Sequence, residues 1–277
     1  MVGALLTEPA TPGADAGALF LDGIGWPAFR GHGLLALVTL AIERGLLTRG
    51  HDPWSGLLID TLAGPIPVRV EVVAGGQSTG RARALRVARV AYESPPARVT
   101  TGGLPVSLAG RTLRVDLVSC AGPFAIADSE SAGVALSSDA LPELRRAAML
   151  VSDAVDTSAR RAPTARREND QVTVVFIGPS NSGSSDLRSA TVFPGGQVSL
   201  APSGRATAAV VAVLDAMGVL PGDRPFTNEG LLGLALEGRV VRRSADDPAA
   251  LTVEIAGTAW PTGDHEFVFR ADDPLGM

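Results

Sequence analysis

The stretch that decides the fold is Gly31-His-Gly-Leu-Leu-Ala-Leu-Val-Thr-Leu-Ala-Ile-Glu-Arg-Gly-Leu-Leu47, a glycine turn followed by an apolar run. Its apolar residues recur at helical spacing and Gly45 supplies a stop signal, so the pattern predicts a helix over residues 31–47. Residues 18–22 predict a short strand, and residues 23–27 predict a turn. The unit is therefore a strand, a turn and an apolar helix.

The same arrangement recurs later in the chain. Residues 198–200 predict a strand, and residues 204–217 predict a second apolar helix, which ends at Gly218. Two similar halves predict a pseudo-symmetric pair of domains, with two helix N-termini facing a shared cleft. Free N–H groups and both helix dipoles would then favour a bound carboxylate. The alternative is that both glycine turns are ordinary helix starts.

The rest of the chain predicts many strands and few helices, which is typical of an α+β fold. A further helix is predicted over residues 141–155. We expect a first domain over residues 1–108, completed by 265–277, and a second domain over residues 109–264. Strands are predicted at residues 57–61, 68–73, 83–90, 113–118, 124–127, 172–177, 188–193, 231–236, 239–243, 251–255 and 266–270.

Composition excludes several classes of function. The chain contains no lysine, so it cannot form an internal Schiff base, and pyridoxal phosphate catalysis is excluded. The net charge of −5 predicts neither nucleic-acid binding nor attachment to an anionic membrane. The most apolar run, residues 34–42, is too short to span a bilayer.

The number and positions of the cysteine and histidine residues limit which chemistry the site can perform. A single cysteine, Cys120, excludes an internal disulfide and fits a reducing cytoplasm. We expect it to be a small buried residue. His51 and His265 are isolated, and no spacing of cysteine, histidine and carboxylate residues predicts a metal site. The expectation is a cytoplasmic protein that uses neither a metal nor a cofactor.

Five segments carry a family resemblance. They are Phe29-Arg-Gly-His-Gly-Leu-Leu-Ala-Leu-Val38, Cys120-Ala-Gly-Pro-Phe-Ala-Ile-Ala-Asp128, Ser185-Asp-Leu-Arg-Ser189, Gln197-Val-Ser-Leu-Ala-Pro-Ser-Gly-Arg-Ala-Thr207 and Asp273-Pro-Leu-Gly276. They resemble segments of the proline racemase and hydroxyproline epimerase family, among them Met-Cys-Gly-His-Gly-Thr-Ile-Ala-Leu and Asp-Arg-Ser-Pro-Cys-Gly-Thr-Gly-Thr. The likeness spans nearly the whole chain.

The resemblance implies the diaminopimelate epimerase fold, in which two similar α/β domains surround a central cleft. Family members work without a cofactor. One cysteine removes the α-proton of the substrate, and a second cysteine, from the opposite domain, returns a proton to the other face. Backbone amides at the two helix starts hold the substrate carboxylate.

The departures from the family pattern predict different chemistry. Arg30 and Ser203 stand where the family has its two cysteines. Arginine stays protonated and cannot act as a base, and a serine hydroxyl is a poor base without a partner, although it can relay a proton. The family's amine-binding aspartate falls on Ser199, which implies a substrate without a cationic secondary amine. Two-base racemisation is therefore not expected.

The resemblance implies that the carboxylate cradle survives. Gly31, His32, Gly33, Gly204 and Arg205 occupy the helix starts whose N–H groups would bind the carboxylate. The cradle thus predicts a small-molecule carboxylate substrate.

For three residues the sequence leaves two alternative roles open. Arg30 is expected to give a bound carboxylate a forked hydrogen bond, or else to point into solvent. His32 is the acid/base candidate by residue type, or else it shapes the loop. Asp186 is a base, or else it holds Arg188.

The leading hypothesis is an isomerase that shifts a proton and a double bond in an unsaturated, pyrroline-type carboxylate derived from proline. Such chemistry needs one acid/base group rather than two opposed thiols. In this respect the chain resembles the proline-racemase-like isomerase of 4-alkylproline pathways, as in lincomycin-type antibiotic biosynthesis. The alternatives are a hydroxyproline dehydratase or epimerase-like enzyme, and a non-catalytic protein that binds proline-like carboxylates.

The first residues, Met1-Val-Gly-Ala-Leu-Leu-Thr-Glu-Pro9, resemble an internal stretch of the family. The resemblance implies an N-terminally shortened first domain, or a start codon assigned too late. A shortened domain would leave sheet edges uncovered, which proteins usually manage by oligomerisation or with a covering loop. A homodimer is one such arrangement.

Overall fold

The computed structural model describes residues 3–23, 25–47, 56–74, 85–108, 110–158, 171–222, 224–266 and 268. They form a 14-stranded sheet with the strand order β1-β2-β3-β4-β5-β14-β13-β12-β10-β9-β8-β7-β6, and β11 pairs with β10 beside this path. The strands are β1 (Gly3–Thr7), β2 (Ala16–Leu21), β3 (Gly56–Thr61), β4 (Ile66–Ala74), β5 (Leu85–Glu93), β6 (Arg98–Leu108), β7 (Arg111–Ser119), β8 (Pro123–Asp128), β9 (Thr173–Gly178), β10 (Leu187–Val192), β11 (Val198–Ser199), β12 (Phe226–Glu229), β13 (Ala235–Arg243) and β14 (Leu251–Gly257).

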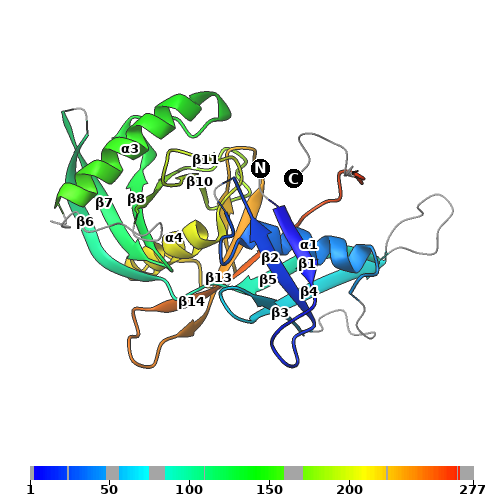
Figure 1. Ribbon diagram of the computed structural model, residues 1–277. Helices are drawn as coiled ribbons and strands as arrows, with labels where there is room; N and C mark the ends of the chain where they lie inside the picture. Colours follow the sequence, from blue (N-terminus) through cyan, green and yellow to red (C-terminus); the bar gives the residue numbers. More distant parts are fainter. Residues whose placement is uncertain are drawn as a thin grey trace.

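The helices are few, and each covers a different part of the sheet. They are α1 (Gly31–Glu43), α2 (Ser129–Ala132), α3 (Leu141–Ser158) and α4 (Gly204–Ala216), with a 3₁₀ turn at Ser138–Ala140. Figure 1 shows α1 beside β1–β5, α3 over β6–β8, and α4 between these two parts. The predicted α+β fold is confirmed.

A strand–helix–strand unit occurs at both helix starts of interest. Strands β2 and β3 are parallel, and α1 connects them. Strands β10 and β12 are also parallel, and α4 lies in their connection. A parallel pair requires a crossover, usually a helix, so both units bring a helix start to the end of a strand. The recurrence seen in the sequence corresponds to these two units.

Helix α1 ends earlier than the sequence pattern predicts. Gly45 has a φ of 69°, and its N–H donates to the Ile42 carbonyl at 3.0 Å. The Leu46 N–H then donates to the Ala41 carbonyl at 2.7 Å. This left-handed termination satisfies the last free carbonyls of the helix and turns the chain away, so the helix ends at Glu43 rather than at residue 47.

Two groups of buried apolar residues form the core. One joins the two similar helices, with Leu34 and Val38 from α1 and Val210 and Val211 from α4. The other places Leu144 and Val151 of α3 against β6–β10. Since α1 and α4 share a core, the positions of their N-termini relative to one another are set by close packing. The division of the chain into domains at residue 108 remains a prediction.

Several predicted strands differ from the structure. Residues 231–236 were expected to form one strand, but the chain turns at residues 230–234, where the Gly233 N–H donates to the Gly230 carbonyl at 3.0 Å. The leucines of this stretch imitate a strand pattern, whereas the flanking glycines close a hairpin between β12 and β13. Glu266 and Val268 are not in a strand, and the other residues of 266–270 lie outside the described residues. Strands β1, β6 and β12 were not predicted.

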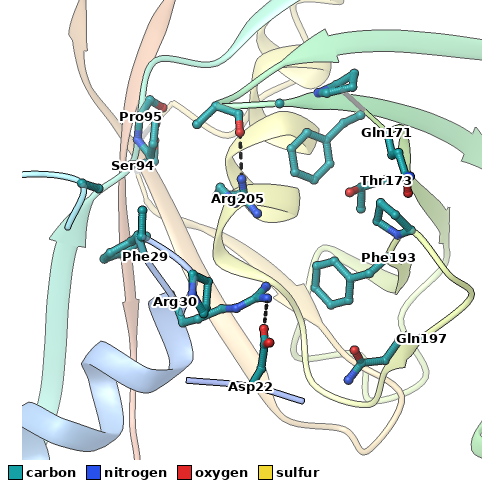
Figure 2. A pocket seen from close by; sticks show the side chains of 18 of the residues that line it. Asp22, Phe29, Arg30, Ser94, Pro95, Gln171, Thr173, Phe193, Gln197 and Arg205 are labelled. Atoms are coloured by element: carbon teal, nitrogen blue, oxygen red, sulfur yellow. Dashed lines mark hydrogen bonds and ion pairs between the residues drawn. The ribbon is translucent and has the colours of Figure 1, made fainter. Parts of the chain in front are cut away.

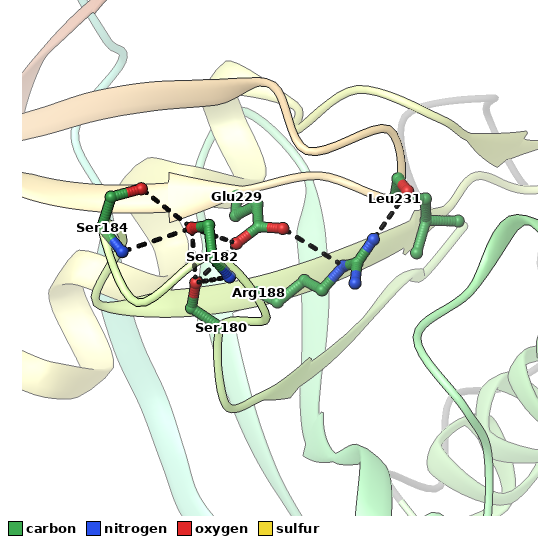
Figure 3. Close-up of polar contacts among 6 residues, drawn as sticks. All are labelled: Ser180, Ser182, Ser184, Arg188, Glu229 and Leu231. Carbon is green, nitrogen blue, oxygen red and sulfur yellow. Dashed lines mark hydrogen bonds and ion pairs between the residues drawn. The ribbon is translucent and has the colours of Figure 1, made fainter.

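A buried polar cluster supports the end of β12. Glu229 is 2% exposed and accepts hydrogen bonds from Ser180 Oγ at 2.5 Å and Ser182 Oγ at 3.0 Å. Arg188 Nε lies 3.7 Å from the Glu229 carboxylate, and Nη2 donates to the Leu231 carbonyl at 2.7 Å (Figure 3). Burial raises the pKa of Glu229, but the two serine hydrogen bonds and the Arg188 charge outweigh it, so the pKa lies below its ordinary value.

We predict that Ser180→Ala destabilises the protein at pH 7 by about 1.5–3 kcal/mol, the usual contribution of a hydrogen bond to a charged group. The lowered pKa of Glu229 means that its carboxylate stabilises the fold above pH 4.5 and that this stability is lost as the pH falls through the folded-state value. The difference in the free energy of unfolding between Ser180→Ala and the wild type should therefore become smaller at acidic pH. Urea unfolding at several pH values measures it.

Ser184→Ala is the matched control, because the Ser184 hydroxyl donates to Ser182 and not to the carboxylate. An equal loss of stability in both variants would contradict the role assigned to Ser180.

Candidate active site

A pocket of about 930 Å³ lies beside the N-termini of α1 and α4. Its walls are largely aromatic and proline side chains, with arginine, glutamine and threonine among them (Figure 2). A concave pocket that combines apolar walls with polar and charged groups is typical of a small-molecule site. The lining includes Asp22, Trp26, Pro27, Phe29, Arg30, Glu93, Ser94, Pro95, Ala121, Gly122, Pro123, Phe124, Gln171, Thr173, Phe193, Pro194, Gln197 and Arg205.

The two helix starts meet at one atom. A Cβ added to Gly31 would lie 2.0 Å from the Tyr92 hydroxyl oxygen, and one added to Gly204 would lie 2.1 Å from the same oxygen. No side chain fits at either position without displacing Tyr92, which explains both glycines. Gly33 is required for a different reason, since its Cβ would lie 2.8 Å from the Phe20 ring.

The backbone donors of both first turns are not used inside the helices. The first helical hydrogen bond of α1 runs from the Leu34 N–H to the Arg30 carbonyl, and that of α4 runs from the Thr207 N–H to the Ser203 carbonyl. Neither Arg30 nor Ser203 caps its helix with a side-chain hydrogen bond. Each start therefore offers free N–H groups at the positive end of a helix dipole.

Two arginines stand at these helix starts and line the pocket. Arg30 forms an ion pair with Asp22 and does not simply point into solvent (Figure 2). Arg205 Nη1 donates to the Ala121 carbonyl at 2.9 Å, and its guanidinium lies 5.9 Å from the centre of the Phe124 ring. Burial lowers the pKa of Arg205, and the charge of Arg30 adds to this effect, so the two cations interact with one another.

The loop that supports Arg205 is strained. Ala121 has a φ of 47°, the only positive value at a residue other than glycine in the described part of the chain. For an alanine this conformation costs about 1–2 kcal/mol. It directs the Ala121 carbonyl toward Arg205, and Gly122 beside it also lines the pocket. Strain of this kind is concentrated at functional sites.

His32 joins the two helix starts. Its Nε2 lies 2.7 Å from the Pro202 carbonyl oxygen, two residues before α4, so this nitrogen carries a proton and donates it. Burial lowers the pKa of His32 below 6.5, against the opposite effect of the Pro202 hydrogen bond. The imidazole is therefore neutral at pH 7, and His32 is not among the residues that line the pocket.

The structure separates the remaining predicted site residues from the pocket. Ser203 is 8% exposed at the start of α4, and Ser199 Oγ donates to the Ala201 carbonyl at 2.7 Å. Asp186 pairs with Arg224 and accepts the Thr227 N–H at 2.8 Å. The expectation that Asp186 holds Arg188 is wrong, because Arg188 lies against Glu229 instead. None of these residues lines the pocket.

Cys120 lies behind the pocket wall. It is fully buried, and its Sγ donates to the Pro95 carbonyl at 3.6 Å. Burial raises the pKa of its thiol to about 12, so the sulfur stays protonated at neutral pH. A protonated, enclosed thiol cannot act as a base or a nucleophile.

Asp22 and Tyr92 were not singled out from the sequence. Asp22 directly follows strand β2, before the turn that leads to α1, a position where polar site residues are common. Tyr92 is the only tyrosine of the chain and lies in strand β5, where several residues are buried. Its residue type was therefore the only feature of the sequence that could have marked it as a site residue.

Two negative findings apply to the described residues. They contain no group of three or more His, Cys, Asp or Glu side chains that could hold a metal ion. In the same part of the chain, no helix is both long and apolar enough to cross a bilayer.

Solved structures of other proteins share this fold. A hydroxyproline epimerase from Agrobacterium vitis with bound trans-4-OH-L-proline superposes with a TM-score of 0.74 at 20% identity, covering 99% of this chain and 76% of the other. A PhzF family phenazine biosynthesis protein from Bacillus anthracis gives a TM-score of 0.59 at 14% identity, covering 93% and 81%. The chain is thus similar to the diaminopimelate epimerase class of folds.

Proteins of similar sequence identify the family of this chain. A proline racemase from Clostridioides difficile is 29% identical over 279 residues, covering 99% of this chain and 80% of its own length. A trans-3-hydroxy-L-proline dehydratase from Bacillus cereus is 27% identical over 277 residues, with the same coverage. The family description "Proline racemase" matches residues 1–277. With its whole length matched, the chain belongs to the proline racemase family and is an enzyme of the isomerase and epimerase type.

Proposed function

We propose that the protein is a cofactor-independent isomerase that binds a small, unsaturated carboxylate derived from proline and moves a proton together with a double bond. One observation carries the proposal. The two helix starts converge beside a pocket, yet the positions where the family has cysteines hold Arg30 and Ser203. The site keeps the means to bind an acid but not the pair of thiols needed to racemise it.

Charge balance supports a bound carboxylate. Asp22 neutralises Arg30, but among the described residues no carboxylate pairs with Arg205. A ligand carboxylate near Arg205 would meet a guanidinium and the free N–H groups of two helix starts. Charge-assisted hydrogen bonds of this kind are roughly twice as strong as neutral ones.

Double-bond migration suits the groups that are present. The reaction removes a proton from one carbon and adds a proton to another, so it needs an acid/base group and stabilisation of the charge in between. Arg205 and the helix dipoles would hold the substrate carboxylate and stabilise negative charge that develops beside it. The aromatic wall formed by Phe29, Phe124 and Phe193 suits a planar ring.

A hydroxyproline dehydratase is the second candidate, because relatives at 27% identity carry the name trans-3-hydroxy-L-proline dehydratase. Arg30 counts against it, since the loss of water also begins with removal of a proton by a base. We further propose that the enzyme acts in the cytoplasm, as a homodimer, in the biosynthesis of 4-alkylproline antibiotics.

We predict that the purified protein changes the ultraviolet spectrum of a dienyl pyrroline carboxylate, because migration of a double bond alters conjugation. A parallel incubation with trans-3-hydroxy-L-proline tests for loss of water. An unchanged spectrum together with tight carboxylate binding would favour a non-catalytic binding protein and contradict the proposal.

Thiol reagents should not inhibit this enzyme. Cys120 is the only cysteine, it is fully buried and its pKa is raised to about 12, so iodoacetamide has no thiolate to attack in the folded state. Incubation with iodoacetamide followed by an activity assay and mass spectrometry measures this. Rapid inactivation with one alkylated cysteine per chain would show that a thiol takes part in the reaction.

Arg205→Gln should weaken the binding of pyrrole-2-carboxylate, a planar ring acid that cannot be isomerised. Loss of about 1.5–3 kcal/mol from a charge-assisted hydrogen bond corresponds to roughly a 10- to 150-fold higher Kd. Calorimetry measures the Kd. Arg243→Gln, which removes a surface pair with Asp215, is the matched control and should bind as the wild type does. Equal affinity in Arg205→Gln and wild type would remove Arg205 from the site.

A further inference from the structure

The proton carrier of the proposed reaction is not among the residues singled out from the sequence. Arg30 is held by Asp22 and remains a cation. His32 donates its Nε2 proton to the Pro202 carbonyl, so that proton is not available to a substrate. Cys120 is enclosed, and the Ser203 side chain is buried and makes no capping hydrogen bond. A group that can both give and take a proton must therefore come from elsewhere.

Tyr92 is placed where such a group is needed. It lies in β5 with 3% of its surface exposed, and its hydroxyl oxygen is the atom against which Gly31 and Gly204 both pack. Within the described residues this hydroxyl has no hydrogen-bond partner. The hydroxyl oxygen is not among the fully enclosed polar atoms that lack a partner, so it keeps some exposure.

Tyr92 is not itself among the residues that line the pocket, but it packs directly behind Phe29, which is. The Phe29 ring packs edge-on against the Tyr92 ring, with centres 5.3 Å apart, and Phe29 lines the pocket. Arg205, which also lines the pocket, interacts electrostatically with the Tyr92 hydroxyl. A carboxylate held between the helix starts and Arg205 would therefore lie next to the phenol.

The surroundings keep the phenol protonated at rest. Burial and the nearby Cys120 raise the pKa of Tyr92, and Arg205 opposes them, so the phenol is protonated at neutral pH. The two helix dipoles and the Arg205 charge all favour a negative charge at the oxygen. They would stabilise a phenolate formed during the reaction without making it the resting state.

We propose that the Tyr92 phenol is the acid/base group that carries the migrating proton. This rests on the proposed function. In the first step the phenol O–H bond breaks and a C–H bond forms at one end of the unsaturated system. In the second step the phenolate takes a proton from another carbon, which restores the O–H bond and moves the double bond. Electrons and protons balance, so no oxidant or co-reactant is needed.

The test uses the wild-type protein and Tyr92→Phe, which removes only the oxygen. We expect Tyr92→Phe to bind pyrrole-2-carboxylate with a Kd within about threefold of wild type, and to isomerise the dienyl pyrroline carboxylate at least 100-fold more slowly, in line with the usual contribution of acid/base catalysis. Thr39→Val is the matched control, because it removes a buried hydroxyl of α1 that bonds only to the Leu35 carbonyl. It should retain the wild-type rate.

A second measurement does not depend on a folded variant. Because Tyr92 is the only tyrosine, protein labelled with tyrosine carrying ¹³C at Cζ gives one signal from this residue. We expect saturation with pyrrole-2-carboxylate to shift that signal, since the phenol gains a hydrogen-bond acceptor.

The outcomes separate the two proposals. Binding of the carboxylate with an unmoved Cζ signal, or a Tyr92→Phe rate above one tenth of wild type, overturns the role of Tyr92 and leaves the proposed function standing. A wild-type protein that binds no carboxylate at all overturns the proposed function.

Discussion

The convergence of two helix N-termini on one phenol oxygen is the contact on which the rest of the site depends. The Tyr92 hydroxyl touches Gly31 and Gly204 so closely that neither position admits a Cβ. Helices α1 and α4 share one apolar core, and His32 joins the start of one to the residues before the other. The free N–H groups of both first turns are therefore held in one small region, at the positive ends of two dipoles.

This convergence creates a concentration of positive charge that the protein only partly neutralises. Arg30 and Arg205 lie close enough for each to affect the other, and Asp22 pairs with the first. Arg205 is held by a backbone carbonyl, which Ala121 presents through a strained conformation. Placing two cations together is unfavourable unless an anion joins them, so the arrangement is easier to understand as a site that receives a carboxylate.

The same environment differs from the two-cysteine site that the family resemblance implies. A helix start favours a thiolate, so cysteines at these positions would be reactive. Here one position holds a permanently charged side chain and the other a serine, and the single cysteine is enclosed in the core. In the proposed mechanism the group left for proton transfer is the neutral phenol of Tyr92, with Arg205 nearby to oppose the effect of burial. This is a suitable group for moving a proton along one face of a conjugated system.

The amino-acid sequence alone was enough to identify the family, the α+β class and the two glycine-led helices, because those features follow from local pattern and from motif residues such as Gly31 and Gly204. It also showed that Arg30 and Ser203 replace the expected thiols. It could not show that Asp186 pairs with Arg224, that residues 231–236 turn, or that Tyr92 lies between the helix starts. Those facts depend on strand order and on the packing of segments far apart in the chain. They could be read only from the folded protein, because the folded sheet brings Tyr92 of β5 to the starts of both helices.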